Sequence, residues 1–484
     1  MKTPEEYVDS LRRMNHEVYM FGERITDHVD HPIIKPSTSA VAATYELAQR
    51  ELAEAPDAQI YTATSHLSKK RISRFTNIHQ SIEDLVKKGK MGRGLGKYTG
   101  CCFQRCVGTD AMNTISIVSH DMDQKHGTVY NRRFLKWLRY IQDEDLVVDG
   151  AMTDPKGDRS LRPSEQADPD QYVHVVEERD EGIVVRGAKL HQTGAVNSHE
   201  ILVMPTRAMT EEDRDYAIAF ALPSDAAGIV YIYGRQSCDT RKMEGGEIDI
   251  GNPLYGGHEA MVVFDDVFVP WDRVFMHREY EFAGDLVEKF AAYHRHSYAC
   301  KAGVGDVLIG ACQLLAEYQG TARASHIRDK IVEMIHLNET MACCSLACAY
   351  EGQREPSGTY LVNTLWSNVA KLNVTRFPYE IARIAQDIAG GSLVTMPSEM
   401  DMKDSKVGKW VRKYLAGVDG VPPEQRSKVM RLIENLTMGT GAVGYLTESM
   451  HGAGSPQAMR IMISRLANVD GMKNAAKRIL ELDG

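Results

Sequence analysis

The sequence predicts an α+β protein in which an N-terminal helical domain is followed by a central β-domain and a C-terminal helical bundle. Helical periodicity dominates about the first 145 of the 484 residues, as in "HQSIEDLVKKGK" and "NRRFLKWLRYIQDEDL". Period-two alternation with β-branched and aromatic residues then runs to about residue 280, and long helical patterns return after it. We therefore expect domains at 1–147, 148–280 and 281–484.

Local signals justify the elements in chain order. Thr3, Pro4 and Glu6 form a capping box with a proline in the first turn, so a helix begins at the N-terminus. The segment "VVDGAMTDPKGDRSLRPSEQADPDQ" is rich in Pro, Asp and Gly, which is typical of a domain junction. The expected strands are "GIVVRGAKL", "EILVMPT", "AIAFALP", "GIVYIYGR" and "AMVVFDDVFVP". The expected C-terminal helices include "SHIRDKIVEMIHLNETMACCSLACAYEG" and "YEIARIAQDIAG".

Charge and hydropathy narrow the function class. The net charge is −9 and no basic stripe stands out, which argues against nucleic-acid binding. The N-terminus lacks an apolar signal-peptide core, and no run of about 18 or more uncharged apolar residues is present. We expect a cytoplasmic protein without a membrane span. Nine cysteines in such a chain are not expected to form a disulfide framework, so they are either buried small hydrophobes or ligands.

The stretch "YTGCCFQRCVGTD" places three cysteines within six residues. On a helix, Cys102 and Cys106 would share one face, whereas Cys101 would point about a hundred degrees away from Cys102 and remain a bystander. Cys344 and Cys348 have the same spacing, but the Ala and Ser residues around them favour a close-packed helix face. Spacing alone leaves both packing and metal binding open for the first segment.

A second segment, "YHRHSYACKAGVGD", favours metal binding over packing for the first cysteine segment. His294, Tyr298 and Lys301 are spaced by four and seven residues, so an uninterrupted helix would place them on one face. Three thiolates and one imidazole would complete a four-ligand site for zinc or for an iron–sulfur cluster. The alternative for an isolated histidine is a core residue with satisfied hydrogen bonds.

Motifs along nearly the whole chain resemble one family. They are "VYMFGERITDHVDHPIIKPS", "CFQRCVG", "VDGAMTDPKGDR", "HQTGAVNSHE", "YGRQSCDTRKME", "GGHEAMVVFDDVFVP", "YHRHSY", "TRFPYEIARIAQDIAGG" and "TESMHGAGSPQAMRIM". The chain resembles the 4-hydroxybutyryl-CoA dehydratases, or vinylacetyl-CoA isomerases. These are a branch of the 4-hydroxyphenylacetate 3-monooxygenase-like flavoproteins with the acyl-CoA dehydrogenase fold.

The resemblance implies a lyase with isomerase activity that contains FAD and a [4Fe–4S] cluster. It would dehydrate 4-hydroxybutyryl-CoA to crotonyl-CoA by a radical route and isomerise vinylacetyl-CoA to crotonyl-CoA, as a homotetramer whose neighbouring subunits complete the flavin sites. The implied cluster ligands are Cys102, Cys106, His294 and Cys300. The implied active-site carboxylates are Glu448 and Glu259, and Tyr298 and Lys301 match auxiliary polar residues.

The chemistry explains this set of groups. The hydrogen lost from C3 is not acidic, so a flavin that accepts one electron from the C2 enolate and returns it makes the dehydration feasible without net oxidation. An iron bound by imidazole can act as a Lewis acid on the substrate hydroxyl. His294 is also a candidate base, Glu448 a candidate acid/base and Glu259 a supporting carboxylate.

The flavin site is not expected to be of the Rossmann type, because no strand is followed by G-x-G-x-x-G. "MTDPKGDR" resembles the acyl-CoA dehydrogenase loop at the isoalloxazine edge. The expected FAD-binding residues are Met152, Thr153, Arg159, Gln192 and Thr193, with Gly390 and Gly391 reaching the FAD of a neighbour.

One interval departs from the family pattern. The spacing from His294 to the third cysteine is one residue shorter, and an ideal helix would put Cys300 about 120° away from His294. Either the helix is distorted there or this ligand approaches from another angle. Two alternative functions stay open: an FADH2-dependent aromatic monooxygenase with inert cysteines, and a flavoprotein with a structural zinc held by the same four residues.

Overall fold

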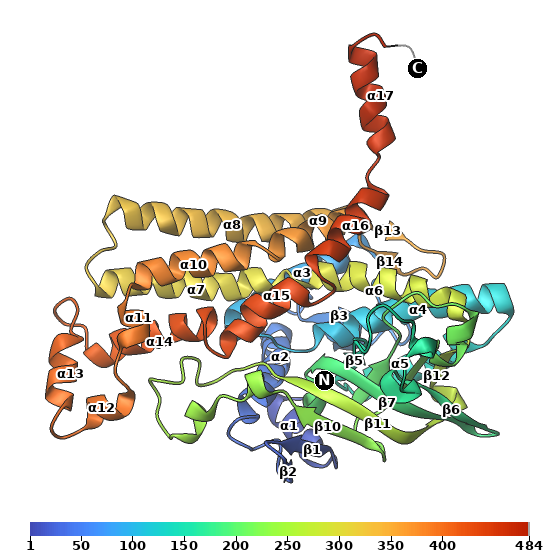
Figure 1. Ribbon diagram of the computed structural model, residues 1–484, viewed down its shortest axis with the longest axis horizontal. Helices are drawn as coiled ribbons and strands as arrows, with labels where there is room; N and C mark the ends of the chain where they lie inside the picture. The colour runs from blue at the N-terminus through green and yellow to red at the C-terminus, as the bar shows by residue number, and fades with distance from the viewer. Residues whose placement is uncertain (483–484) are drawn as a thin grey trace.

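The N-terminal part of the chain consists mainly of helices that pack against the β-domain and the C-terminal bundle (Figure 1). The computed structural model describes residues 1–482. The helices of this part are α1 (Pro4–Arg12), α2 (Lys35–Glu54), α3 (Ile82–Thr99), α4 (Cys106–His126) and α5 (Tyr130–Asp143). The predicted capping box is confirmed, because Thr3 Oγ1 accepts a hydrogen bond from Glu6 N at 3.2 Å and Glu6 Oε2 accepts one from Thr3 N at 2.8 Å.

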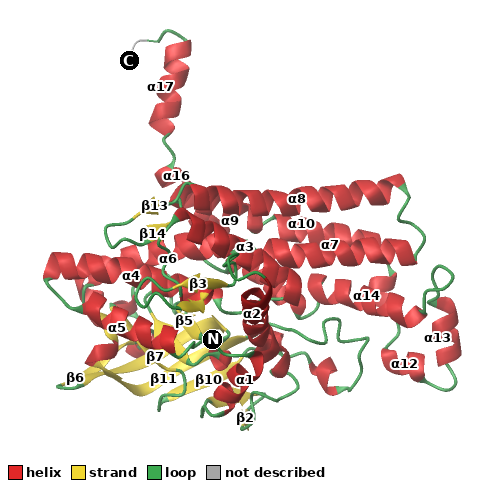
Figure 2. Cartoon of the chain, turned by 180° about the vertical axis from the view of Figure 1, so that it is seen from behind, coloured by secondary structure: helices red, strands yellow, loops and turns green. Residues whose placement is uncertain are grey.

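Two sheets form the β-domain and lie to one side of the long helices (Figure 2). The larger sheet has the order β2–β1–β10–β11–β7–β6 and the smaller has the order β12–β9–β8–β5. Their strands are β1 (Glu17–Met20), β2 (Glu23–Ile25), β5 (Val148–Ala151), β6 (His174–Arg179), β7 (Gly182–Thr193), β8 (Glu200–Val203), β9 (Ile218–Pro223), β10 (Ile229–Tyr233), β11 (Glu259–Pro270) and β12 (Val274–His277). The five predicted strands are confirmed as β7 to β11.

The N-terminal part is not purely helical, in contrast to the prediction. Strand β1 pairs in parallel with β10, and β2 pairs antiparallel with β1, so both extend the larger sheet. They are only four and three residues long, too short for a period-two pattern to stand out. Two further pairs, β3 (Thr62–Thr64) with β4 (Arg71–Ser73) and β13 (Gln353–Arg354) with β14 (Tyr360–Leu361), are small hairpins.

The C-terminal part is a bundle of long helices with short ones at its end. They are α6 (Ala283–Ser297), α7 (Cys300–Tyr318), α8 (Ser325–Tyr350), α9 (Thr364–Val374), α10 (Phe377–Ala389), α11 (Ser392–Thr395), α12 (Glu399–Lys403), α13 (Gly408–Tyr414), α14 (Pro423–Thr437), α15 (Glu448–His451), α16 (Pro456–Leu466) and α17 (Val469–Ile479). The two quoted helical segments are confirmed as α8 and α10. A π-helical segment, Val443–Thr447, leads directly into α15.

The stretch Tyr280–Tyr318, which contains α6 and α7, is long and apolar enough to cross a membrane by length and composition. However, 67% of its most apolar window is buried inside the protein. Core helices of globular bundles have the same composition, so this stretch is explained by its packing.

Helices α3 and α7 approach each other unusually closely, and this contact positions the site. A Cβ atom on Gly96 of α3 would lie 2.3 Å from the carbonyl oxygen of Cys300, and one on Gly303 of α7 would lie 2.1 Å from the carbonyl oxygen of Arg93. Only glycine fits at such contacts. The end of α3, and the loop that follows it, are thereby held against the first turn of α7.

Candidate active site

The first cysteine segment is a loop rather than a helix. Helix α3 ends at Gly100, which has a left-handed conformation with φ 63°, and Gln104 is also left-handed with φ 68°. Helix α4 begins only at Cys106. The prediction that Cys102 and Cys106 share a helical face is therefore wrong. Two left-handed residues turn the chain, and they bring Cys102 and Cys106 to the same region by a different path.

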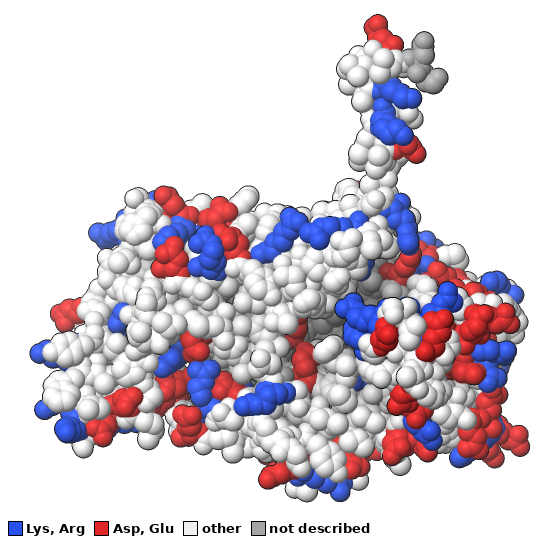
Figure 3. All heavy atoms as spheres, viewed as in Figure 1, with Lys and Arg blue, Asp and Glu red and all other residues white. Residues whose placement is uncertain are grey.

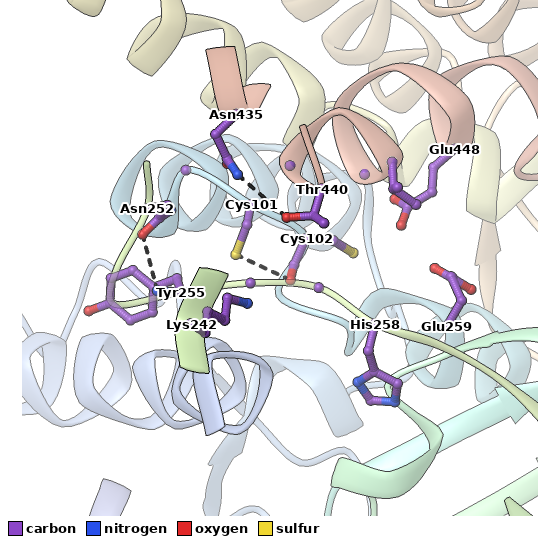
Figure 4. Close-up of a pocket in the computed structure, with 16 residues that line it drawn as sticks. Cys101, Cys102, Lys242, Asn252, Tyr255, His258, Glu259, Asn435, Thr440 and Glu448 are labelled. Atoms are coloured by element: carbon purple, nitrogen blue, oxygen red, sulfur yellow. Dashed lines mark hydrogen bonds between the residues drawn. The ribbon is translucent and has the colours of Figure 1, made fainter. Parts of the chain in front are cut away.

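Within this loop, Cys101 and Cys102 direct their sulfur atoms to opposite sides (Figure 4). The Cys101 thiol donates a hydrogen bond to the Cys102 carbonyl oxygen at 3.5 Å. Cys101 thus points away from Cys102, as expected, although the reason is the loop conformation and not helical geometry.

The second segment contains a break in the helix. Helix α6 ends at Ser297, Tyr298 is its C-cap, and α7 begins at Cys300. The uninterrupted helical face predicted for His294, Tyr298 and Lys301 does not exist. The three side chains still meet, because the rings of His294 and Tyr298 are in edge contact at 5.4 Å and Lys301 Nζ lies 5.4 Å from the Tyr298 ring centre. Of the two alternatives that the shortened interval left open, the structure has the first, a distorted helix.

Three thiols gather where the loop meets α7. Cys106 packs against the apolar cluster that contains Cys300. Burial raises the pKa values of Cys102 and Cys106 well above the usual thiol value, and that of Cys300 also rises. The Cys300 thiol also contributes to the rise in pKa at both Cys102 and Cys106. Without a metal, these thiols are therefore neutral.

A carboxylate on the neighbouring helix α4 orients the imidazole of His294. Its Nδ1 atom lies 2.8 Å from Asp110 Oδ2, one helical turn after Cys106 on α4. The Nε2 atom is the ring nitrogen that remains for a ligand. Within residues 1–482, no group of three or more His, Cys, Asp or Glu side chains is arranged to hold a single metal ion.

Two carboxylates face each other across the cleft, Glu259 at the start of β11 and Glu448 at the start of α15 (Figure 4). Burial, together with the charge and hydrogen bond of Glu448, raises the pKa of Glu259 well above its usual value. Thr193 Oγ1 donates to Glu259 Oε1 at 2.6 Å, since β7 and β11 pair at these residues. Glu259 therefore holds a proton at neutral pH.

Lys301 connects the carboxylates to the thiol segment. Its Nζ atom lies 2.7 Å from Glu448 Oε2 and donates to the Gly444 carbonyl oxygen at 2.6 Å. Burial lowers the Lys301 pKa, but the charges of Glu448 and of Cys300 more than offset this, and the net pKa is raised well above 10.5. Gly444 belongs to the π-helical segment, a type of helix distortion that is frequent at functional sites.

A cleft of about 540 Å³ runs past these groups. The cysteines lie between the two carboxylates on one side and polar residues on the other (Figure 4), and the lining includes Cys101, Cys102, Glu259, Glu448, Lys242, Asn252, Tyr255, Asn435 and Thr440. In the space-filling view this face of the molecule is hollowed between the helical bundle and the β-domain, with Lys and Arg side chains at the edge (Figure 3).

The residues predicted to bind FAD fall into three places. Met152 is buried beside Thr153, and Gln192 Nε2 donates to the Thr153 carbonyl oxygen at 3.3 Å, so these residues and Thr193 form one group at the end of β7. Arg159 is exposed in the loop after β5. Gly390 and Gly391 lie between α10 and α11, at the far end of the bundle in Figure 1, and a Cβ atom on either would meet nothing within 4 Å.

Sequence reasoning missed three buried polar residues of this region. Asp110 and Lys88 form a buried ion pair behind His294, and the spacing of four residues from Cys106 to Asp110 was the available signal. Lys371 of α9 is fully buried, with Nζ 4.2 Å from the Tyr298 ring centre and 2.5 Å from the Ser449 carbonyl oxygen. Burial and the charges of Lys301 and Arg295 lower its pKa well below 10.5. Nothing in the local sequence distinguishes Lys371.

Models of the N-terminal and C-terminal parts of 4-hydroxyphenylacetate 3-hydroxylase match residues 3–276 and 283–481. The chain belongs to this family. One family member, the 4-hydroxybutyryl-CoA dehydratase/vinylacetyl-CoA-Δ-isomerase of Clostridium aminobutyricum, is 56% identical over 489 residues, which cover 99% of both chains. The predicted resemblance to these dehydratases is thus confirmed.

Solved structures of the 4-hydroxyphenylacetate 3-hydroxylase family, and of more distant proteins with the same fold, resemble this chain along nearly its whole length. An oxygen-tolerant archaeal 4-hydroxybutyryl-CoA dehydratase from N. maritimus superposes with a TM-score of 0.97 at 54% identity, covering 100% of this chain and 95% of that chain. The oxygenase component of 4-hydroxyphenylacetate 3-monooxygenase complexed with FAD gives 0.84 at 24% identity, covering 99% and 98%. Glutaryl-coenzyme A dehydrogenase gives 0.50 at 10% identity, covering 93% and 95%. The predicted α+β, acyl-CoA dehydrogenase-like fold is confirmed.

Proposed function

We propose that this protein dehydrates 4-hydroxybutyryl-CoA to crotonyl-CoA and water and isomerises vinylacetyl-CoA to crotonyl-CoA. Full-length similarity to the clostridial enzyme supports both activities. The observation that carries the proposal is Lys301, which follows Cys300 in the chain and pairs with Glu448 at 2.7 Å. This link holds a proton-transfer pair directly against a cluster of thiols, which a hydroxylase has no need of.

The donor set fits a [4Fe–4S] cluster, with Cys102, Cys106, Cys300 and His294 as the proposed ligands. Three thiols, of which Cys300 is buried and Cys102 and Cys106 are half-buried, and an imidazole whose Nδ1 is engaged by Asp110 are the donors such a cluster takes. Each iron of a four-iron cluster takes its own protein ligand, so these ligands lie farther apart than those around one ion. Ligand binding would release the thiol protons.

The second proposed cofactor is FAD. The oxygenase component of 4-hydroxyphenylacetate 3-monooxygenase was solved as a complex with FAD. Met152, Thr153, Arg159, Gln192 and Thr193 would hold it in the same chain. The open space around Gly390 and Gly391 fits contact with the FAD of a neighbouring subunit. When bound, FAD would supply a temporary one-electron acceptor, and the cluster would supply a Lewis-acidic iron for the substrate hydroxyl.

The side chains of this protein would manage the protons. Glu448 Oε2 is held by Lys301, so proton transfer falls to its other oxygen, with Glu259 as the neutral partner. His294 is a second candidate base for the proton at C2. Tyr298 is buried between Lys301 and Lys371, and burial raises its pKa well above 10, so it enters as a neutral donor. The reaction removes water without net oxidation or reduction.

An assembly of several subunits, a homotetramer, belongs to the proposal. Helix α17 extends away from the body of the protein, and none of its residues is buried (Figures 1 and 2). Its apolar residues Val469, Met472 and Ile479 are 51%, 64% and 75% exposed. Such an amphipathic helix gains stability by packing on another chain. We also propose an acyl-CoA substrate, a cytoplasmic location, which nine unpaired cysteines favour, and neither a nucleic-acid nor a membrane partner.

The test is the composition and activity of anaerobically purified protein. Dehydration is supported if the protein holds about four irons per chain with flavin absorption and forms crotonyl-CoA without NAD(P)H, oxygen or an external acceptor. An absolute requirement for oxygen and a reductant would assign the monooxygenase reaction known for more distant family members instead. Zinc in place of iron would refute the dehydratase proposal.

A further inference from the structure

Asp110 is a fully buried carboxylate with contacts on both oxygen atoms. It lies on α4 at 0% exposure, one turn after Cys106. Its Oδ2 atom accepts hydrogen bonds from His294 Nδ1 and from Ser297 Oγ, each at 2.8 Å. Its Oδ1 atom accepts from Lys88 Nζ, and Lys88 also donates to the Tyr293 carbonyl oxygen at 3.1 Å. Helices α3, α4 and α6 therefore meet at this one side chain.

Stability alone does not account for this arrangement. Burying an ion pair is costly, and an apolar pair of similar volume often serves a core as well. Lys88 also occupies only one of the two Asp110 oxygen atoms. The other faces α6, where it meets His294 and Ser297 together.

The contact determines which nitrogen of His294 carries the proton. An ionised carboxylate can only accept hydrogen bonds, so His294 Nδ1 must be the donor and Nε2 keeps its lone pair. Two rings limit the rotation of the imidazole: Phe290 stacks on it at 5.2 Å with an interplanar angle of 22°, and Tyr298 meets its edge. The ring is thus fixed in both tautomer and orientation.

We propose that Asp110 is the positioning residue for the cluster, because one of its oxygens holds His294 with Nε2 free to bind iron while the other is paired with Lys88. The inference rests on the proposed cluster function and goes beyond it by assigning two residues that touch neither cofactor nor substrate. Carboxylates behind metal-binding histidines tune affinity and electron density at the metal in this way.

The first test is Asp110→Asn, which preserves side-chain volume. Lys88 can only donate hydrogen bonds, so it keeps the side-chain oxygen of the asparagine. The asparagine must therefore turn its amide nitrogen toward His294 Nδ1. That contact requires the other tautomer, with a proton on Nε2. Iron affinity should fall by about 10- to 100-fold, and any cluster that remains should show a higher midpoint potential, because the histidine donates less electron density. Iron per chain and the potential are measured on anaerobically purified protein.

A second variant separates positioning from simple loss of structure. In Lys88→Met/Asp110→Asn the ammonium is gone, so the asparagine oxygen can face His294 again, and iron content should recover toward the wild-type value. Glu200→Gln is the matched control, since Glu200 is a buried carboxylate of β8 that accepts from Arg273 at 2.7 Å and from Trp137 of α5 at 3.0 Å. It should leave iron content and potential unchanged.

The outcomes divide cleanly. Wild-type iron content and potential in Asp110→Asn, or a double variant as poor in iron as the single one, would refute the positioning role while leaving the dehydratase proposal intact. An equal loss of iron in Glu200→Gln would also refute it, by showing a general effect of buried charge. Wild-type protein without iron would overturn both proposals together.

Discussion

Glu259 and Glu448 form a pair in which burial, and then the neighbouring Glu448 carboxyl, raise the pKa of Glu259, while Glu448 Oε2 is paired with Lys301 Nζ at 2.7 Å. The two residues are nearly two hundred positions apart, on a strand of the β-domain and at the end of a π-helical segment of the bundle. Two neighbouring carboxyls of unequal proton affinity are a common basis for acid–base chemistry. Their separate origins mean that the pair exists only when the β-domain and the bundle are packed together.

The first prediction concerns the thiols. Cys102→Ala, Cys106→Ala and Cys300→Ala should each lose iron and activity, because no other thiol replaces the missing ligand. Cys101→Ala is the matched control, since its sulfur points away from Cys102, and Cys344→Ala on α8 is a second one. Iron per chain after anaerobic purification decides the matter. Loss of iron in Cys101→Ala with retention in Cys102→Ala would assign the wrong cysteine to the site.

A second prediction uses the contact between α3 and α7. Gly96→Ala would place a Cβ atom 2.3 Å from the Cys300 carbonyl oxygen, so α7 must shift. We expect a loss of about 1–3 kcal/mol in the free energy of unfolding, typical of overpacking, together with reduced iron content. The control is Gly310→Ala on α7, the helix that Gly96→Ala would displace. A Cβ atom on Gly310 would meet nothing within 4 Å. This control variant should stabilise the helix by about 0.5–1 kcal/mol and keep the iron. Equal iron in both variants would show that this contact does not position Cys300.

The sequence predicted the strands of the β-domain better than the local geometry of the candidate site. The five predicted strands follow from their alternation, whereas a single missing residue between His294 and Cys300 left open whether the helix is distorted or the ligand approaches from another angle. The conformation of Cys101–Arg105 could not be predicted, because Gln104 adopts φ 68° although it is not a glycine. Contacts such as Asp110 with His294 join residues 184 positions apart, and helical periodicity reports only neighbours within a few turns.

A third prediction concerns pH and Asp149 of β5. Its carboxylate is buried and forms no ion pair among the described residues, and burial raises its pKa to about 7 although the backbone N–H of Gly150 lowers it. The folded state therefore binds this proton more tightly than the unfolded state, whose carboxyl has the ordinary value of 3.8. Stability from this group is complete below about pH 4 and is lost as the pH rises toward 7. At about 1.4 kcal/mol per pH unit, the loss approaches 4 kcal/mol.

Asp149→Asn removes this titration. The variant should unfold at higher urea concentration than wild type at pH 8, and the difference should shrink as the pH falls toward 4. Glu200→Gln should not reproduce this gain at pH 8, because Glu200 has Arg273 and Trp137 as partners. Unfolding curves at pH 5 and pH 8 measure the effect. A wild-type protein with equal stability at both values would mean that Asp149 is ionised in the fold.

The last prediction assigns the proton transfer to Glu448. Glu448→Gln keeps the side-chain volume, and the amide oxygen can still accept the hydrogen bond of Lys301 that now holds Oε2 at 2.7 Å. FAD and iron content should therefore stay near wild type. Dehydration should fall by about 10²- to 10⁴-fold, the usual cost of a lost acid–base group. Isomerisation of vinylacetyl-CoA should fall as well, because it also moves a proton although it releases no water.

Glu339→Gln on α8 is the control. It removes a carboxylate that pairs with Arg93 at 3.0 Å outside the cleft, and it should leave both rates unchanged. The decisive measurement is both activities on cofactor-replete protein. If Glu448→Gln retains near-normal rates, Glu448 only anchors Lys301, and His294 becomes the base to test.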